Sequence, residues 1–147
     1  MGEVVIDSLG FLLNRALWTL VTSLNAAFNK NGIDLSQSQY VVMRVLDIQE
    51  GMSQNKLSTM MHKDAAAIKR SIDILEKKGL VIRKAVTGRK NGLYLTDKGK
   101  ALMPQIKAIA DEVMGGTFGR TEEERQACVT FLECIYRFYE EKGNQEE

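Results

Sequence analysis

The amino-acid sequence predicts a mainly α-helical domain with one small β-hairpin. Apolar residues recur at intervals of three and four along most of the 147 residues, and the chain contains a single proline. The pattern changes to the alternation typical of strands only between residues 80 and 95. Apolar residues make up 44% of the chain and charged residues 27%, so a disordered or collagen-like chain is excluded.

The first two helices are predicted before residue 51. Apolar residues recur at helical spacing over residues 4–29, and Asn31-Gly32 follows as a left-handed stop. A second helix begins near Ser36 and ends near Gly51. The first helix, roughly 26 residues long, exceeds what a small domain needs. We therefore expect it to pack against its own chain on one side and against a partner on another.

Two shorter helices and a hairpin are predicted in the middle of the chain. Ser53 and Asp64 are suited to cap the two helices, and Gly79 stands where a C-terminal helix glycine belongs. The residues that follow alternate, and glycines surround a basic turn that holds Arg89 and Lys90, which indicates a hairpin. The expected ranges are 54–61 and 65–78 for the helices, 80–85 and 93–95 for the strands, and 87–92 for the turn.

Two longer helices complete the predicted fold. The first extends from Thr96 to about Met114, and Pro104 is expected to break its hydrogen-bond ladder early. The second begins at a capping box, Thr121-x-x-Glu124, and ends near Tyr139. An apolar stripe on this last helix provides a second long surface that one small core cannot cover.

The charges of the chain are unevenly distributed. The net charge is only +1, which excludes a uniformly basic protein. The segment from Gly51 to Gly99, however, contains eleven basic and four acidic residues, a net charge of +7 that the remainder offsets with −6. A basic segment of this density favours a polyanion as partner, although a solvated surface would carry the same charge. The pattern of elements has to decide between the two.

That pattern is a winged helix-turn-helix, because two short helices joined by a turn precede a basic hairpin. On the second helix, Ile68, Ile72 and Leu75 share one face and are expected to pack inward. Small and basic residues on the other face can approach a DNA groove, where Arg70 can contact guanine or a phosphate. The candidate DNA contacts are Ser53, Gln54, Lys63, Asp64, Ala66, Ala67, Lys69, Arg70, Arg89 and Lys90.

Three segments of this region resemble the MarR family of transcriptional regulators. GMSQNKL at 51–57 is similar to the start of that family's scaffold helix. IDILEKKGLV at 72–81 resembles its recognition-helix end with the first wing strand, and LTDKG at 95–99 resembles its junction from wing to helix. The resemblance covers nearly the whole chain and implies one domain over residues 1–147. Its implied parts are a winged-helix region at about 33–99 and dimerisation helices at about 1–31 and 100–147.

Two features depart from the family pattern. Thr87-Gly88-Arg89 stands where the wing usually carries an acidic residue and two arginines, so the acid and the first arginine are absent. Alanines at 65–67 replace polar residues early in the recognition helix. Fewer direct base contacts are therefore expected, with more weight on Lys69, Arg70 and DNA shape.

The resemblance also implies a small aromatic or phenolic effector, bound between the dimerisation and DNA-binding regions. Trp18, Phe28, Tyr40 and Met43 are the candidates for such a site. The same residue types also form dimer cores, and we favour that interpretation for any single one of these four residues.

Other chemistry finds little support in the sequence. His62 is the single histidine, so a Cys/His zinc site cannot be assembled, and no metal, cofactor or enzymatic activity is predicted. Cys128 and Cys134 lie six residues apart in one predicted helix, and we expect buried or half-buried thiols. Glu3 and Asp7 precede any apolar run, so no signal peptide is expected. The longest uncharged stretch, residues 16–29, is too short and too polar to span a membrane, and a reduced cytoplasmic setting is the default.

The leading prediction is a sequence-specific DNA-binding transcriptional regulator, a repressor more readily than an activator. It is expected to act as a homodimer on a near-palindromic double-stranded operator and to respond to a small-molecule effector. The alternative is a winged-helix protein-interaction module without DNA binding, to which the alanine run and the altered wing give weight. The basic middle segment argues against that alternative.

Overall fold

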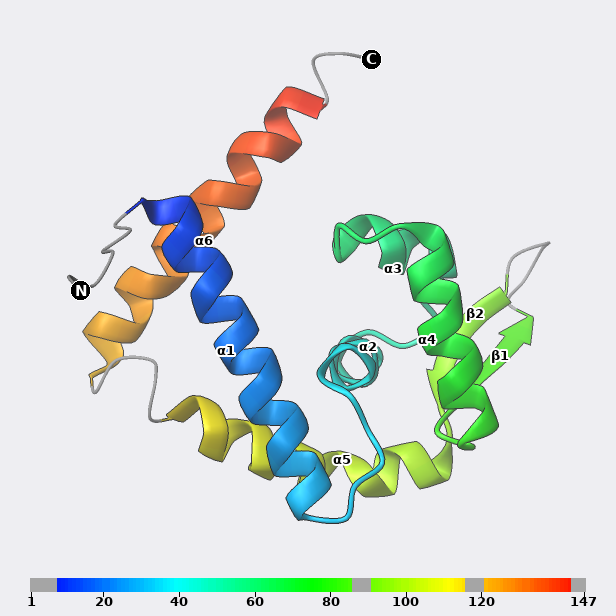
Figure 1. Ribbon diagram of the computed structural model, residues 1–147. Helices are drawn as coiled ribbons and strands as arrows, with labels where there is room; N and C mark the ends of the chain where they lie inside the picture. The colour runs from blue at the N-terminus through cyan, green and yellow to red at the C-terminus, as the bar shows by residue number, and fades with distance from the viewer. Residues whose placement is uncertain (1–7, 86–90, 116–120, 144–147) are drawn as a thin grey trace, which may run out of the picture. The chain divides into compact units, whose positions relative to one another are not determined.

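The computed structural model describes residues 8–85, 91–115 and 121–143, and within them it contains six helices and one two-stranded sheet (Figure 1). The prediction of a mainly helical chain with one hairpin is confirmed. The chain divides into two compact units, residues 1–110 and 111–147. No helix among the described residues combines the length and the apolar character that crossing a membrane requires.

The first unit begins with two capped helices. Helix α1 (Leu9–Lys30) starts where the Ser8 hydroxyl accepts a hydrogen bond from the Phe11 amide, and the predicted start at residues 4–7 lies outside the described residues. Gly32 follows with a φ of +68°, the left-handed conformation expected of a helix stop. Helix α2 (Gln37–Ile48) begins with a capping box, contacts α1, α4 (Ala65–Lys77) and β2 (Asn91–Leu95), and buries Val42, Met43 and Leu46.

The helix-turn-helix consists of α3 (Gln54–Met60) and α4 (Ala65–Lys77). Ile68, Ile72 and Leu75 of α4 are at most 1% exposed, and α4 contacts both α2 and α3. The expectation that these three residues pack inward is therefore confirmed. Burying such a side chain typically contributes about 1.5–3 kcal/mol, so this face determines how α4 is rotated about its axis.

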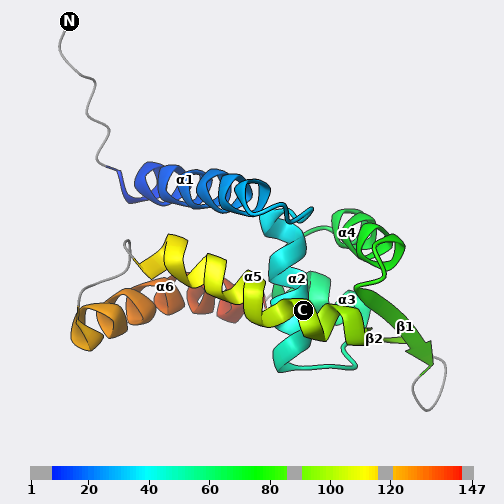
Figure 2. The ribbon, with the colours of Figure 1, turned by 90° about the horizontal axis from the view of Figure 1, so that it is seen from below.

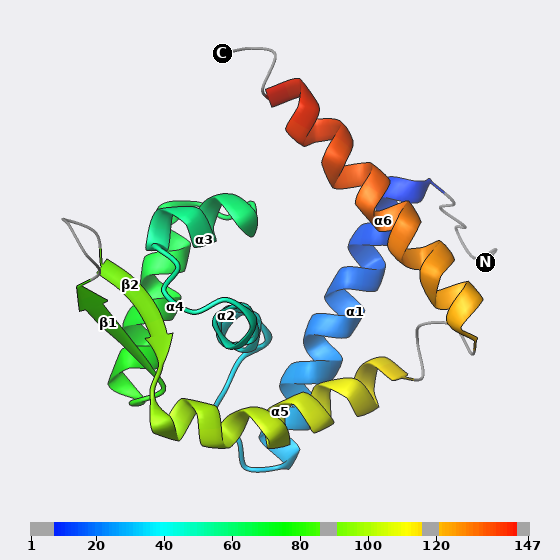
Figure 3. The ribbon, with the colours of Figure 1, turned by 180° about the vertical axis from the view of Figure 1, so that it is seen from behind.

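The hairpin consists of the antiparallel strands β1 (Val81–Ala85) and β2 (Asn91–Leu95), which lie beside α4 (Figure 3). The segment Gly51–Met52 pairs with β2 at Leu93. The Leu93 carbonyl accepts from the Gly51 amide at 2.8 Å, and the Leu93 amide donates to the Met52 carbonyl at 2.9 Å. The segment that precedes α3 is thereby attached to the hairpin. The turn at 86–90 lies outside the described residues.

Two of the sequence motifs meet at the base of the hairpin, where α5 (Asp97–Gly115) follows β2 (Figure 2). The Thr96 hydroxyl donates to the Gly79 carbonyl at 2.5 Å and accepts from the Gly99 amide at 3.0 Å. The Thr96 amide also donates to the Leu80 carbonyl at 3.0 Å. The end of α4, the start of β1 and the start of α5 are therefore joined through one threonine.

Helix α5 continues through Pro104 without interruption, although we expected a broken ladder there. Proline removes one donor, and its exposed position allows the helix to tolerate that loss.

Helix α6 (Glu122–Gly143) forms most of the second unit and begins with the predicted capping box, in which Thr121 and Glu124 bond reciprocally. No described residue of α6 is buried. The prediction that both thiols are buried or half-buried is confirmed for Cys128, which is half-buried, and is wrong for Cys134, which is exposed.

The close approach of α5 to the hairpin generates a stability prediction. A Cβ at Gly99 would overlap the Leu80 carbonyl oxygen, which already accepts the Thr96 amide. Gly99→Ala is therefore expected to lower the free energy of unfolding by about 1–3 kcal/mol, as overpacked sites do. Urea unfolding measures this change. Gly115→Ala, in the same helix with no atom within 4 Å of the added Cβ, is the control and should shift stability by no more than about 0.5 kcal/mol. Equal stability of the two variants would contradict the account.

Candidate nucleic-acid interface

The outer face of α4 combines small residues with two cations. Because the opposite face is buried, Ala65, Ala66, Lys69 and Arg70 are exposed at the N-terminal half of the helix. The carboxylate of Asp64 accepts from the Ala67 amide at 2.7 Å and thus caps the helix. Alanine side chains leave the backbone accessible, so this end of α4 can approach another surface closely.

The cations of α4 differ in their pairing. The Lys69 ammonium lies 2.7 Å from the Asp73 carboxylate, although its side chain is 62% exposed. Arg70 and Lys77 are exposed, and no carboxylate of the described residues pairs with either of them. Arg70 is therefore the side chain in the N-terminal half of α4 whose donors remain available to a ligand.

The other predicted contacts are distributed around α4. The Ser53 hydroxyl accepts from the Lys56 amide at 3.2 Å and caps α3, and the neighbouring Gln54 is half-buried. Lys63 is exposed in the turn between α3 and α4. Arg89 and Lys90 lie outside the described residues. These assignments to DNA binding remain predictions.

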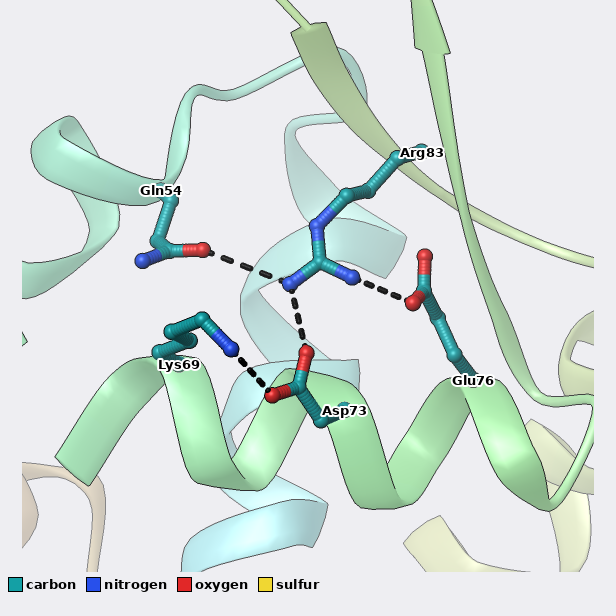
Figure 4. Close-up of polar contacts among 5 residues, drawn as sticks. All are labelled: Gln54, Lys69, Asp73, Glu76 and Arg83. Atoms are coloured by element: carbon teal, nitrogen blue, oxygen red, sulfur yellow. Dashed lines mark hydrogen bonds and ion pairs between the residues drawn. The ribbon is translucent and has the colours of Figure 1, made fainter. Parts of the chain in front are cut away.

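A polar cluster that was not predicted ties the hairpin to both helices (Figure 4). The Arg83 guanidinium, from β1, donates to the Asp73 carboxylate at 2.9 Å and also to the Glu76 carboxylate. It donates in addition to the Gln54 amide oxygen at 3.4 Å. We call these four residues together with Lys69 the Arg83 cluster. Its members come from α3, α4 and β1, so it fixes the position of the wing strand relative to the helix-turn-helix.

The electrostatics of the Arg83 cluster are balanced. Hydrogen bonds from Lys69 and then from Arg83 hold the pKa of the Asp73 carboxyl below its ordinary value, so it is ionised at neutral pH. Two cations face two carboxylates, and the cluster carries no net charge. The charge of Lys69 is consequently offset within the cluster, whereas no acid of the described residues pairs with Arg70.

A cavity of about 770 Å³ lies beside the helix-turn-helix within the first unit. Its walls come from α1, from α2 and from the end of α3 with the turn that follows, and they are mainly apolar. Its lining residues are Leu17, Trp18, Val21, Asn25, Ser36, Gln37, Ser38, Val41, Val45, Met60, Met61 and Lys63.

Of the four residues proposed for an effector site, Trp18 lines this cavity. Phe28 and Met43 have no exposed surface and belong to the core of the first unit. Tyr40 is half-buried, and its ring lies 5.7 Å from that of Phe28. The aliphatic and sulfur side chains that make up half of the lining residues were not among the sequence candidates, because their spacing is also that of ordinary core residues.

Comparison of the chain with known proteins identifies the family to which this fold is similar. The model of the MarR family matches residues 35–88, which include α2, α3, α4 and β1. The chain is 31% identical over 101 residues to the HTH-type transcriptional regulator TtmR of Methylorubrum extorquens strain PA1. That alignment covers 67% of this chain and 51% of the relative, so the chain spans about half the length of that curated protein.

Solved structures match over nearly the whole chain. A MarR-family transcriptional regulator from Rhodococcus sp. RHA1 superimposes with a TM-score of 0.79 at 28% identity, covering 91% of this chain and 96% of that one. BpsR of Bordetella bronchiseptica, whose DNA binding is regulated by 6-hydroxynicotinic acid, superimposes with a TM-score of 0.77 at 25% identity, covering 92% and 98%. From its winged helix-turn-helix and these matches, the chain belongs to the MarR family of transcriptional regulators.

Proposed function

We propose that the chain is a cytoplasmic, sequence-specific DNA-binding regulator that acts by binding and not by turnover. The observation that carries the proposal is the outer face of α4, where the exposed Ala65 and Ala66 precede Arg70, a cation that pairs with no carboxylate of the described residues. A recognition helix inserts such a face into the major groove, with its N-terminal residues at the base edges. Lys63 precedes α4 and Lys77 follows Arg70 by two turns, so both extend the basic surface toward phosphates.

Homodimerisation is the second part of the proposal. Helix α1 exposes Leu9, Leu17 and Trp18, with Trp18 61% exposed. Helix α6 exposes Phe131 and Phe138 on one side, and none of its described residues is buried. Apolar surfaces of this extent on a small protein mark contact sites. Two-fold pairing of such helices would place two copies of α4 on one side of a DNA duplex.

Effector binding is the third part, and the cavity supports it. Its volume and apolar wall suit a small aromatic molecule, while Lys63 and the serines at the start of α2 add polar groups. Met61 and Lys63 line the cavity and also belong to the turn that leads into α4. A bound molecule therefore has a direct route to the position of the recognition helix. BpsR, with its small aromatic regulator, supports this chemistry by similarity.

The DNA proposal predicts a selective effect of Arg70→Ala. Loss of a bidentate base contact typically costs about 1–3 kcal/mol, which is roughly a 5- to 150-fold loss of affinity. This loss should appear on duplex DNA selected by the wild type from a random library and should be much smaller on random DNA. Fluorescence anisotropy measures both affinities. Lys107→Ala, which removes an exposed cation of α5, is the matched control and should change neither affinity substantially. Equal losses of affinity for selected and random DNA would mean that Arg70 contacts a phosphate and not a base.

The dimer proposal predicts that the wild type sediments as a dimer at micromolar concentration. Phe131→Glu, on the apolar face of α6, should raise the dissociation constant about a hundredfold or more, because a two-fold interface loses two buried rings. Gln126→Glu introduces the same charge at an exposed position about 140° around α6 from Phe131, away from the apolar stripe, and should leave the dimer intact. A wild type that sediments as a monomer, or equal dissociation of the two variants, would refute the proposed interface.

The effector proposal predicts that hydroxylated aromatic acids, beginning with 6-hydroxynicotinic acid, change the fluorescence of Trp18, the only tryptophan of the chain. The same acids should shift DNA affinity about fivefold or more. Val45→Phe fills the cavity and should abolish both responses while DNA binding persists. Ile48→Phe, 73% exposed on the same helix and away from the cavity wall, should respond as the wild type does. Absence of any response across the panel at millimolar concentration would contradict an effector site here.

A further inference from the structure

We propose that Arg83 is a positioning residue for DNA recognition, which holds the wing strand and directs the amide nitrogen of Gln54 toward a DNA phosphate. This inference rests on the proposed DNA binding and assigns a task to residues that do not face the major groove themselves. Three donated hydrogen bonds connect Arg83 of β1 to α3 and α4. A rigid guanidinium fork can satisfy several acceptors at once, which a lysine ammonium on a flexible stem does less well.

The chemistry of Arg83 determines which end of the Gln54 amide is free. Arginine has no acceptor, so the amide oxygen of Gln54 has to face the guanidinium. Figure 4 shows this arrangement, with the amide nitrogen pointing away from Arg83. A glutamine that pairs with adenine needs both its oxygen and its nitrogen. With its oxygen held by Arg83, Gln54 turns its two amide donors away from the cluster, and such donors suit a phosphate oxygen.

The surroundings of Gln54 agree with a phosphate contact. A hollow of about 290 Å³ lies between the start of α3 and the hairpin, and Gln54, Asn55, Asn91 and Arg83 are among its lining residues. Amide side chains commonly bind DNA phosphates and fix the register of a protein on the duplex. A phosphate seated here would contact the helix-turn-helix and the wing together.

The balanced charge of the Arg83 cluster makes the proposal testable in two directions. Loss of the Arg83 charge leaves Asp73 and Glu76 with one remaining cation, so the surface becomes more negative. Loss of the Asp73 charge does the opposite and also releases Lys69. The two changes should therefore move the affinity for random DNA in opposite directions, because that affinity depends on charge. Both should lower the preference for selected DNA, because both disturb the same arrangement.

The experiment compares Arg83→Gln, Asp73→Asn, Arg83→Lys and the control Lys84→Gln, which removes a cation from the next position of β1. Anisotropy titrations with selected and random duplexes, at several salt concentrations, give the ratio of affinities. We expect Arg83→Gln to weaken binding to both DNAs and Asp73→Asn to strengthen binding to random DNA about threefold to tenfold. The affinity ratio should fall about tenfold in both variants. Arg83→Lys should restore charge but only part of the ratio, and Lys84→Gln should leave the ratio unchanged.

A second measurement on the free protein separates positioning from folding. Hydrogen exchange of the Val81–Ala85 amides should accelerate in Arg83→Gln and not in Lys84→Gln, while the exchange of α2 remains as in the wild type. A wild type that prefers no DNA overturns the proposed function and this inference together. A selective wild type whose affinity ratio survives in both Arg83→Gln and Asp73→Asn overturns the inference alone, and so does unchanged exchange in the hairpin.

Discussion

Exclusion of one face of α4 from water is the constraint on which the proposed DNA-contacting surface depends. Ile68, Ile72 and Leu75 have almost no exposed surface, and their burial fixes the rotation of the helix. Helical periodicity alone then places Ala66 and Arg70 on the outer side of α4. The same burial brings Asp73 to the edge of the helix, half-exposed, where Arg83 of the neighbouring strand can reach it. The apolar core thus decides which polar side chains are available to a ligand and which are used within the protein.

The wing and α4 are connected at both ends of their contact. The Arg83 cluster joins the middle of α4 to β1, and Thr96 joins the region after α4 to the start of α5. Lys78, directly after α4, connects the end of that helix to α2, because its ammonium donates to the Asp34 carbonyl at 2.7 Å and to the Gln39 amide oxygen at 3.1 Å. A helix held in this way would lose little freedom on binding a ligand, which favours affinity through preorganisation.

Much of the fold could be predicted from the sequence, because helix ends are local events. Ser53, Asp64 and Gly79 mark the boundaries of α3 and α4, and each acts through a hydrogen bond or a positive φ close by in the chain. The Arg83 cluster was not predicted, because its hydrogen bonds join residues that are distant from one another in the sequence. The acids Asp73 and Glu76, three positions apart on α4, with Arg83 in the following strand, were the available signal.

The residues of the proposed effector site were harder to predict from the sequence, for a physical reason. Phe28 and Met43 have the side chains of a ligand pocket, but large apolar side chains are used first to fill a core. Val41 and Val45 line the cavity, yet their helical spacing is the same as that of buried neighbours in α2. Which apolar residues line a cavity depends on how α1 and α2 meet, and periodicity within one helix does not contain that information.

The central claim is that two copies of α4 contact DNA as a symmetric pair. Selection of duplexes from a random library, followed by hydroxyl-radical footprinting of the enriched sequence, tests it most directly. The account predicts a near-palindrome with two protected half-sites whose centres lie about 34 Å apart, one turn of the duplex. Failure to enrich any sequence, with no protection at low salt, would contradict the account and favour a winged-helix module that binds protein.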